Sequence, residues 1–387
     1  MAFGVYVHLP YCAKKCPYCD FNSYGVGNRF PEAEYTEAVL KEIGLYAESI
    51  EKLPLTSIFF GGGTPSLFSE VNIGKVIDKI LRITSPLNSP EVTLEVNPET
   101  VDLGKLRRFR EAGVNRISVG VQSFSERKLQ TLGRTNTPDI SRRVMEDIGR
   151  AGFDNFSLDL MFGVSFETLD EWKTDLENAL LCDTTHISAY CLTVEENTEF
   201  GKLYSHGKLQ LPDDETLIEM LILAADFLGR AGYSQYEISN FAKPGFKSRH
   251  NLLYWQSENY LGLGAGAHSH FSPYESSLWG ARWANVKNPA LYMKTVSEGK
   301  KPIAFTEILS RKEALQDKIL MGLRLEEGVN VESLTGRFGV RLCLDKLNFL
   351  IDSGFIYLSD GLLRLNKRGI PVSNELIVKV VDSLAFV

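Results

Sequence analysis

Six short runs of β-branched and aromatic residues alternate with longer amphipathic segments over the first 231 residues of the chain. The short runs have the composition of strands, and the apolar residues of the longer segments recur at helical spacing. Ala112-Gly113 and Ala151-Gly152 are typical helix ends that lead into the next strand. This strand-then-helix order indicates a parallel sheet wrapped by helices, either a barrel or a doubly wound sheet.

Unusual polar residues fall at the C-terminal ends of these strands. A cysteine-rich loop follows the first strand, and Gly61-Gly62-Gly63-Thr64-Pro65 follows the second. Glu95, Gln122 and Asp159 lie at or near the ends of the next three, and Thr193 follows the sixth. Barrel enzymes build their sites on this rim from several strands, whereas doubly wound sheets concentrate theirs at one switch point. The distribution therefore favours a barrel.

The expected strands are Phe3–Leu9, Ser57–Gly61, Val92–Val96, Arg116–Val121, Asn155–Met161 and His186–Leu192. The expected helices are Ala33–Ile50, Val71–Ile83, Leu103–Ala112, Ser141–Ala151, Thr168–Leu181 and Glu215–Ala231. Six units are too few to close an eight-fold barrel. We therefore predict an α/β fold whose main part is an open, partial (β/α)6 TIM-type barrel.

Composition divides the chain into three parts. Residues 1–233 carry the strand–helix units, and residues 234–300 are rich in glycine and aromatic residues without a clear repeat. Residues 301–387 are predicted to be mainly helical and similar to a winged-helix module. The elements expected there are helices Lys312–Arg324, Val331–Phe338 and Leu342–Ser353 and strands Phe355–Leu358 and Leu362–Leu365. This part is not notably basic, so we expect a packing or lid role rather than DNA binding.

Charge and hydropathy exclude several classes of function. The net charge of −7 over 387 residues argues against nucleic acid as the main partner, because that affinity comes largely from Lys and Arg. No apolar run is long enough for a transmembrane segment, and the N-terminus lacks a signal-peptide pattern, so we expect a cytoplasmic protein. In that reducing compartment, Cys182, Cys191 and Cys343, which each stand alone, are expected to be small buried apolar residues.

The other three cysteines, Cys12, Cys16 and Cys19, form a C-x3-C-x2-C pattern. Three thiolates on one loop can hold three irons of a 4Fe-4S cluster and leave the fourth iron open. The amino and carboxylate groups of S-adenosylmethionine could chelate that open iron. The alternative is a structural zinc site completed by His8, although zinc sites more often pair two knuckles of two ligands each.

This chain resembles the radical SAM superfamily, whose signature is the same cysteine spacing after a first barrel strand. Further motifs occur in order and are similar to the branch that contains oxygen-independent coproporphyrinogen III oxidase and the HemW heme chaperones. These motifs are Tyr6-Val7-His8-Leu9-Pro10, Gly61–Pro65, Leu94-Glu95-Val96-Asn97-Pro98, Gly120-Val121-Gln122-Ser123-Phe124, Leu132-Gly133-Arg134 and Asp159-Leu160-Met161-Phe162-Gly163.

The resemblance implies a set of residues that bind S-adenosylmethionine: Tyr6, Tyr18, Gly62, Gly63, Thr64, Glu95, Gln122, Arg134 and Asp159. The Gly62–Thr64 turn would approach the methionine amine closely, as glycine allows. Glu95 and Asp159 could accept hydrogen bonds from amino and ribose hydroxyl groups, and Arg134 could pair with the carboxylate. Taken singly, each of these residues is more often structural or solvated.

Three features favour the HemW group over the oxidase. As the resemblance implies, the oxidase extends its motif by a fourth cysteine, where this chain has Phe21, and carries an N-terminal arm before the first strand, which here begins at Phe3. The run from Arg249 to Trp255 contains the H-N-x-x-Y-W motif of the HemW group. We therefore expect a heme chaperone that serves a heme-acceptor protein and draws on an electron donor. The alternative is a radical SAM oxidoreductase that acts on a porphyrinogen.

The H-N-x-x-Y-W motif makes His250 the candidate axial ligand of heme, since imidazole commonly binds heme iron. Lys247 and Arg249 could then meet the propionates. His250 could instead be a hydrogen-bonded structural histidine, which is the commoner role of a lone histidine. His268 and His270 are rival ligands in the same part of the chain.

Overall fold

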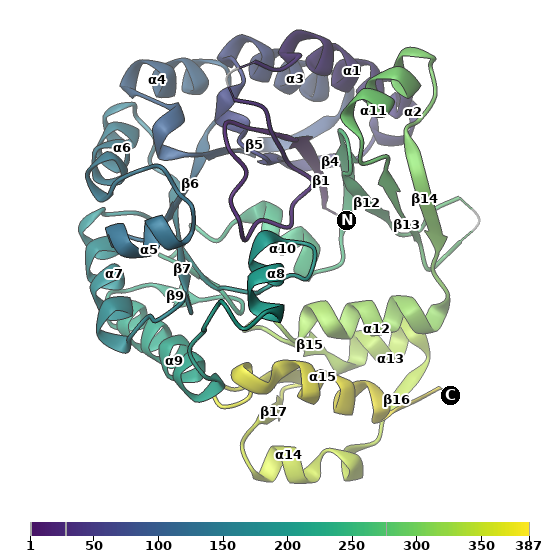
Figure 1. The fold of residues 1–387 in the computed structure, drawn as a ribbon. Coiled ribbons are helices and arrows are strands. Elements are labelled where there is room, and N and C mark those ends of the chain that lie inside the picture. Colours follow the sequence, from purple (N-terminus) through teal and green to yellow (C-terminus); the bar gives the residue numbers. More distant parts are fainter. Residues whose placement is uncertain (1, 28, 276, 387) are drawn as a thin grey trace.

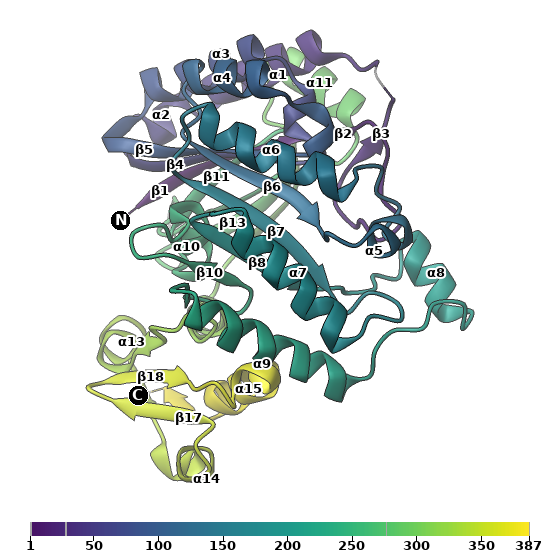
Figure 2. The same cartoon turned by 90° about the vertical axis from the view of Figure 1, so that its left-hand side faces the viewer.

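The computed structural model describes residues 2–27, 29–275 and 277–386. Within these residues, twelve strands form one sheet in the order β14-β13-β12-β11-β1-β4-β5-β6-β7-β8-β10-β9 (Figures 1 and 2). The strands are β1 (Phe3–Leu9), β4 (Pro54–Gly62), β5 (Ser85–Val96), β6 (Arg116–Gln122), β7 (Phe156–Phe162), β8 (His186–Cys191), β9 (Ser234–Gln235), β10 (Asn240–Ala242), β11 (Asn259–Leu263), β12 (His268–Phe271), β13 (Ala281–Asn285) and β14 (Ile303–Ile308).

The six predicted strands are present and pair in parallel in chain order, from β1 through β4, β5, β6 and β7 to β8. Strand order that follows chain order is the order of a barrel rather than of a doubly wound sheet. The parallel strands curve around an interior, and the helices lie outside them (Figure 1). The predicted α/β fold with an open, partial barrel is confirmed.

Two groups of strands that the sequence did not indicate extend this sheet. β10 and β9 continue it beyond β8 in antiparallel pairing. On the other edge, β11 pairs in parallel with β1, and β12, β13 and β14 follow in antiparallel order. All six strands come from the glycine- and aromatic-rich part of the chain and the residues just after it, so segments distant in sequence complete both sides of the barrel.

Helices cover the outer face of the parallel strands. The helices of this part are α1 (Glu32–Leu45), α2 (Ala47–Ile50), α3 (Glu70–Ile83), α4 (Leu103–Glu111), α5 (Glu126–Thr131), α6 (Pro138–Arg150), α7 (Leu169–Leu181), α8 (Glu199–Ser205), α9 (Asp214–Arg230), α10 (Arg249–Trp255) and α11 (Pro289–Ser297). The predicted helix Ala33–Ile50 is two helices that meet at Tyr46. Side-chain caps begin the main outer helices: Ser69 for α3, Asp102 for α4, Thr137 for α6, Thr168 for α7 and Asp213 for α9.

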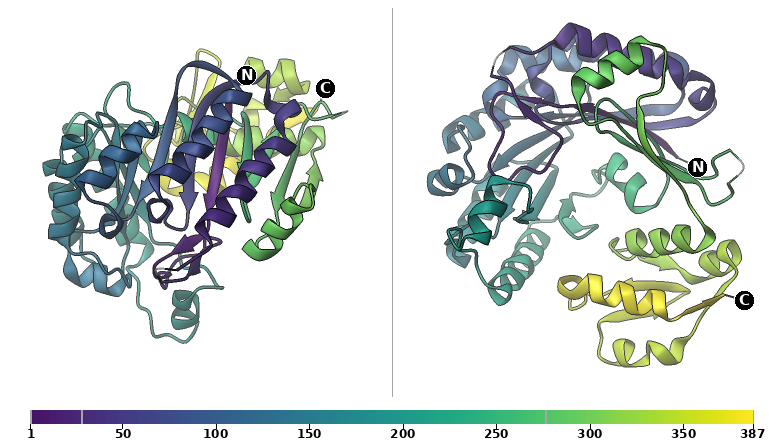
Figure 3. Two further views of the ribbon diagram at one scale, coloured as in Figure 1. Left: turned by 90° about the horizontal axis from the view of Figure 1, so that it is seen from above. Right: turned by 45° about the vertical axis from the view of Figure 1, so that its right-hand side comes forward.

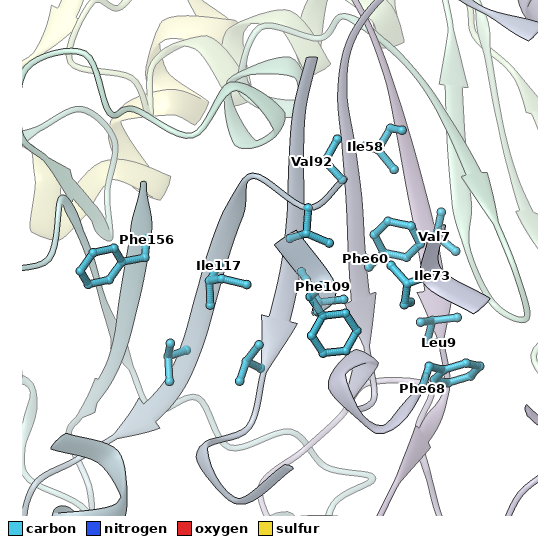
Figure 4. Close-up of a cluster of buried hydrophobic side chains, with 14 of the residues drawn as sticks. Val7, Leu9, Ile58, Phe60, Phe68, Ile73, Val92, Phe109, Ile117 and Phe156 are labelled. Carbon is cyan, nitrogen blue, oxygen red and sulfur yellow. The ribbon is translucent and has the colours of Figure 1, made fainter. Parts of the chain in front are cut away.

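Side chains alternate between the two faces of each parallel strand, and the two sets differ in character. The apolar set faces the helices, where strand residues such as Ile58, Phe60 and Ile117 share one cluster with Ile73 of α3 and Phe109 of α4 (Figure 4). The opposite set is largely polar. It includes Tyr6, His8, Ser57, Thr93, Glu95, Arg116, Ser118, Ser157, Asp159, His186 and Ser188. The interior of the barrel is therefore lined by polar groups rather than filled by aliphatic layers.

The C-terminal part has its own hydrophobic cluster, which includes Ile319, Leu334, Leu363 and Ile377. Its elements are α12 (Arg311–Gly322), β15 (Val329–Asn330), α13 (Val331–Phe338), β16 (Val340–Leu342), α14 (Asn348–Asp352), β17 (Ile356–Ser359), β18 (Leu362–Leu365), α15 (Ser373–Asp382) and β19 (Leu384–Phe386). The first two predicted helices and the hairpin are present. The third, Leu342–Ser353, is wrong in its first half, where β16 ends and a single 3-10 turn precedes α14. Figure 3 (right) shows this part beneath the open side of the sheet.

No helix in the described part of the chain is long and apolar enough to cross a membrane.

Candidate functional site

Cys12, Cys16 and Cys19 lie on one loop after β1, and a short parallel pair of strands, β2 (Tyr11–Cys12) and β3 (Tyr24–Gly25), closes this loop. A turn in which the Cys19 amide donates to the Cys16 carbonyl at 3.1 Å shapes its middle. Cys12 is buried, while Cys16 and Cys19 are partly exposed. Burial raises the pKa of the Cys12 thiol, and hydrogen bonds with Thr64 and Ser23 oppose that rise.

The arrangement around the loop does not fit a zinc ion shared with His8. The His8 Nε2 donates to the Asn22 carbonyl at 2.9 Å, and its Nδ1 accepts from the Tyr6 hydroxyl at 3.0 Å. Across the described ranges, no three His, Cys, Asp or Glu side chains converge on a point that one metal ion could occupy. Three thiolates that each bind a different iron of a cubane need no such common point. The donor set therefore fits a cluster better than a single ion.

The Gly61–Pro65 turn packs directly against the cysteine loop. The Gly63 and Thr64 amides donate to the Leu9 and Tyr11 carbonyls at 2.8 and 2.9 Å. A Cβ on Gly63 would lie 2.7 Å from the Tyr11 carbonyl oxygen, so no larger residue fits. Gly62 has a φ of +112° and donates its amide to Glu95 at 3.2 Å. These glycines are therefore required by contacts within the protein, whatever else binds beside them.

Arg134 connects the end of β6 to the cysteine loop. Its Nη1 donates to the Cys16 Sγ at 3.9 Å, and its Nη2 donates to the Gly120 carbonyl at 2.6 Å. Between Gly120 and Gln122 the strand has a bulge, and Gln122 takes a positive φ of 67°. A non-glycine residue in that region is uncommon, and bulges at barrel rims redirect side chains. Tyr18 lies beside Cys16 and Arg134, where burial raises the pKa of its hydroxyl.

Glu95 of β5 and Asp159 of β7 place two carboxylates on the inner face of the barrel, with β6 between their strands. Asp159 accepts hydrogen bonds from Ser118 at 3.2 Å and from Ser157 at 3.4 Å. Burial, and then the nearby Asp159, raise the pKa of Glu95 to about 8. The structure thus brings Glu95, Gln122, Arg134 and Asp159 to the same end of the sheet as the three cysteines, as the polar strand ends predicted.

Arg116 is a residue that the sequence analysis missed. It is only 2% exposed, and its Nε has no hydrogen-bond partner within the described residues. Its positive charge, after burial, lowers the pKa of both His186 and His250. Arg116 stands two positions before Ser118 in the alternating run Arg-Ile-Ser-Val-Gly-Val-Gln, so the alternation alone could have placed it in the interior.

His250 lies at the opposite end of the barrel from the cysteine loop. A Cβ on Gly4, near the start of β1, would be 3.3 Å from the His250 Nδ1, whereas the cysteines follow the end of that strand. Figure 2 shows α10, which carries His250, toward the end where β1 starts. Glu91 fixes this helix by accepting the amides of Arg249 and His250, each at 3.1 Å.

Both ring nitrogens of His250 are occupied. Nδ1 is joined to the Ser57 hydroxyl at 2.8 Å and Nε2 to the Tyr254 hydroxyl at 2.9 Å. The ring stacks on Phe59 with centroids 5.1 Å apart, and the residue is 1% exposed. Burial, with the charge of Arg116, lowers its pKa to about 3. These contacts suit the alternative in which His250 is a hydrogen-bonded structural histidine. Iron ligation by His250 remains a prediction, and it requires one of the two hydrogen bonds of the ring to break.

The two basic residues beside His250 are also engaged. Lys247 pairs with Glu327 at 3.2 Å, and the Arg249 guanidinium donates to the Ser89 carbonyl at 3.2 Å. Of the rival histidines, His270 is joined through Nδ1 to the Glu258 carbonyl at 3.1 Å, whereas His268 is exposed at the start of β12.

Comparison with known proteins identifies the family of this chain. Residues 6–179 match the family model of the radical SAM superfamily, and residues 309–372 match that of the HemN C-terminal domain. The heme chaperone HemW of Bacillus subtilis (strain 168) is 36% identical over 376 residues, which cover 96% of this chain and 97% of that protein. HemW of Escherichia coli (strain K12) is 41% identical over 266 residues, or 68% of this chain and 69% of that protein.

More distant similarities extend the comparison. Radical S-adenosyl methionine domain-containing protein 1, mitochondrial, of Bos taurus is 33% identical over 396 residues, which cover 98% of this chain and 88% of that protein. Among solved structures, coproporphyrinogen III oxidase (HemN) from Escherichia coli superposes with a TM-score of 0.81 over 98% of this chain and 89% of that one. At 19% identity, that match establishes the shared fold alone.

Proposed function

The chain belongs to the HemW heme chaperones of the radical SAM superfamily, and from this premise we propose that it binds heme and passes it to an acceptor protein. The observation that carries the proposal is the similarity to HemW of Bacillus subtilis, which runs through 97% of that protein. The C-terminal part is included in this match, so the proposal rests on the whole architecture rather than on the cysteine motif alone.

Membership of the superfamily implies a 4Fe-4S cluster and S-adenosylmethionine, and we propose Cys12, Cys16 and Cys19 as the cluster ligands. The residue at the position of the oxidase's fourth cysteine, Phe21, is 65% exposed and offers no ligand atom. Three thiolates leave one iron open for the amino and carboxylate groups of S-adenosylmethionine. When bound, the cluster supplies the electron for reductive cleavage of that cofactor, so an electron donor is a further proposed partner.

The rim residues support a site for S-adenosylmethionine next to the cysteine loop. We propose that Arg134, held by the Gly120 carbonyl beside Cys16, pairs with the cofactor carboxylate. Glu95 and Asp159 would accept hydrogen bonds from its amino and hydroxyl groups, and Gln122 can both donate and accept. Tyr6, Tyr18 and the Gly62–Thr64 turn complete the proposed set.

The variant Arg134→Ala tests this site. We expect the affinity for S-adenosylmethionine to fall roughly ten- to a hundredfold, the worth of a charge-assisted contact of ~1.5–3 kcal/mol, while the iron content stays at the parent level. Isothermal titration of the reconstituted protein measures the affinity. Arg143→Ala, which removes an exposed guanidinium on α6, is the control and should leave it unchanged. Equal affinity in Arg134→Ala and the parent would refute the assignment.

A radical SAM oxidoreductase that acts on a porphyrinogen is the second candidate. The observation in its favour is the set of polar residues at the strand ends around the cysteine loop. One of them, Gln122, has a positive φ, and a protein that only carries heme would not need this strained backbone conformation. Exposed Phe21 in place of a cysteine argues the other way.

Parallel assays of anaerobically reconstituted protein separate the two functions. We expect the protein to bind ferric heme, to pass it to apomyoglobin offered as a heme acceptor, and to leave coproporphyrinogen III unchanged in the presence of S-adenosylmethionine and a reductant. Absorption spectra follow heme transfer, and chromatography of the porphyrins follows conversion. Turnover of coproporphyrinogen III without heme binding would reject the chaperone in favour of the enzyme.

A further inference from the structure

A buried carboxylate outside the proposed cofactor site joins segments that are distant in the sequence. Glu42 of α1 is fully buried, and three groups donate hydrogen bonds to its carboxylate. They are the Gly264 amide at 2.8 Å, the Asn285 Nδ2 at 2.6 Å and the Tyr292 hydroxyl at 2.6 Å. Tyr292 belongs to α11, which lies beside α1 (Figure 1). Burying a carboxylate is costly unless hydrogen bonds satisfy it, so the three donors are needed at this position.

The Glu42 carboxylate holds the turn between β11 and β12, residues 264–267, in two ways. It accepts the Gly264 amide directly, and it accepts from the Asn285 Nδ2, which also donates to the Gly264 carbonyl at 2.9 Å. The Asn285 Oδ1 has no hydrogen-bond partner among the described residues. Because an unpartnered buried oxygen is unfavourable, the orientation of this amide is set by the two oxygens that its Nδ2 contacts.

The same turn packs against the end of β1, just before the cysteine loop. Gly264 has a φ of +96°, and a Cβ at this position would lie 2.4 Å from the His8 carbonyl oxygen. The Tyr35 hydroxyl joins the two segments, because it donates to the His8 carbonyl at 3.0 Å and accepts the Ala265 amide at 2.8 Å. A displacement of the turn would therefore displace the backbone that leads into the cysteine loop.

Asn22 connects the turn to the cysteine loop itself. Its Nδ2 donates to the Ala265 and Lys287 carbonyls, each at 2.9 Å. Its own carbonyl accepts the His8 Nε2 at 2.9 Å. Both the side chain and the backbone of Asn22 are thus fixed by residues that contact the turn or lie beside it.

Ser23, which follows Asn22 directly, contacts two of the proposed cluster ligands. It is buried, and its hydroxyl lies 3.6 Å from the Cys19 Sγ and also hydrogen-bonds with the Cys12 thiol. Hydrogen bonds to ligand sulfurs and the groups that orient the ligands tune an iron–sulfur cluster. A continuous series of contacts therefore connects Glu42, through the turn and Asn22, to the cysteine sulfurs.

We propose that Glu42 is a positioning residue for the iron–sulfur cluster and acts on the cysteine loop through residues 264–267 and Asn22. This inference rests on the proposed cluster and names the residues that hold its loop in place. It also gives residues 234–300 a role at the cluster, because all three donors to Glu42 belong to that part of the chain.

The rate at which a chelator removes iron from the reconstituted full-length protein tests this role. Glu42→Gln keeps the size of the side chain but places N–H donors opposite groups that are themselves donors. We expect iron release to become about fivefold faster, the equivalent of the ~1 kcal/mol that one hydrogen bond contributes. Assays at mildly alkaline pH keep the carboxylate of the parent ionised, since burial raises the pKa of Glu42 to about 7.

Two further variants separate positioning from a general loss of stability. Tyr292→Phe removes the donor to Glu42 that does not contact the turn. It should lower the thermal unfolding midpoint, yet iron release should stay within about twofold of the parent and the electron paramagnetic resonance spectrum of the reduced cluster should not change. In Glu42→Gln that spectrum should change. Asn22→Ala breaks the last link, so the double variant with Glu42→Gln should release iron no faster than either single variant.

Iron release in Glu42→Gln that is no faster than in Tyr292→Phe would overturn the positioning role, and additive effects in the double variant would overturn the connection through Asn22. If Glu42→Gln does not fold, Asn285→Ala tests the same step and should speed iron release equally, because it removes the amide between Glu42 and the Gly264 carbonyl. A parent protein that incorporates no iron would instead overturn the cluster on which the inference rests.

Discussion

Replacing Cys12, Cys16 or Cys19 by alanine is expected to abolish the iron–sulfur cluster, which is the largest effect of any single change considered for this chain. A cubane held by three thiolates cannot lose one of them and keep its remaining irons protected, because the described residues of the loop include no fourth cysteine. Iron and sulfide analysis of anaerobically reconstituted protein, together with the brown absorption of the cluster, measures the loss. The parent should carry about four irons per chain.

The other three cysteines provide the control. Cys182 lies at the end of α7 and Cys191 at the end of β8. The prediction that these cysteines and Cys343 are buried is wrong, since Cys182 and Cys343 are partly exposed and Cys191 is exposed. Alanine at these positions should leave iron content unchanged. Stoichiometric zinc without iron in the reconstituted parent would contradict the cluster assignment and would require the His8 ring to leave Tyr6 and Asn22.

Lys128→Met is expected to be the most destabilising of the substitutions outside the cysteine loop. The Lys128 ammonium is fully buried and pairs with Glu167 and, at 2.7 Å, with Asp175. Asp175 in turn accepts from the Ser123 hydroxyl and the Phe124 amide, each at 2.7 Å. The substitution leaves two carboxylates in the interior without their cation, and breaking a buried pair in this way costs about 3–5 kcal/mol.

Urea unfolding, followed by tryptophan emission, measures this loss of stability as a lower midpoint. The substitution should also disturb the proposed S-adenosylmethionine site, because α5 carries Lys128 and leads into the segment that contains Arg134. Lys173→Met is the matched control, since Lys173 pairs with Glu177 at 3.7 Å on the surface of α7 and such pairs contribute about 0–1 kcal/mol. Equal midpoints for the two lysine variants would show that the buried pairs contribute no more than the exposed one.

The sequence alone determined the barrel and the loop that it carries. Local patterns decide where a strand starts and ends, and β1 and the helix α13 occupy the predicted residues throughout. Polar residues at strand ends predicted the rim, because parallel strands bring their C-terminal ends to one edge whatever their order. The cysteine spacing and the motifs around it carried the family resemblance, which the comparisons confirm.

The strands beyond residue 233 could not be predicted in the same way. They are two to six residues long, and the pairing partner of β11 is β1, more than two hundred residues earlier in the chain. These short strands contain glycine and aromatic residues and show no regular alternation of apolar and polar side chains. Their pairing depends on the strand edges that the parallel sheet leaves unpaired. The third helix expected in the C-terminal part failed for a related reason, since β16 pairs there with the distant β19.

Only the tertiary structure decided that the His250 ring is engaged within the protein. The H-N-x-x-Y-W motif singled out His250, but the sequence does not show which groups the two ring nitrogens contact. The Ser57 hydroxyl, 193 residues away in the chain, is hydrogen-bonded to the His250 Nδ1, and the Tyr254 hydroxyl is hydrogen-bonded to its Nε2. The sequence shows which side chains could act as ligands. Contacts between residues distant in sequence determine whether a histidine ring nitrogen is available to a ligand or is already hydrogen-bonded within the protein.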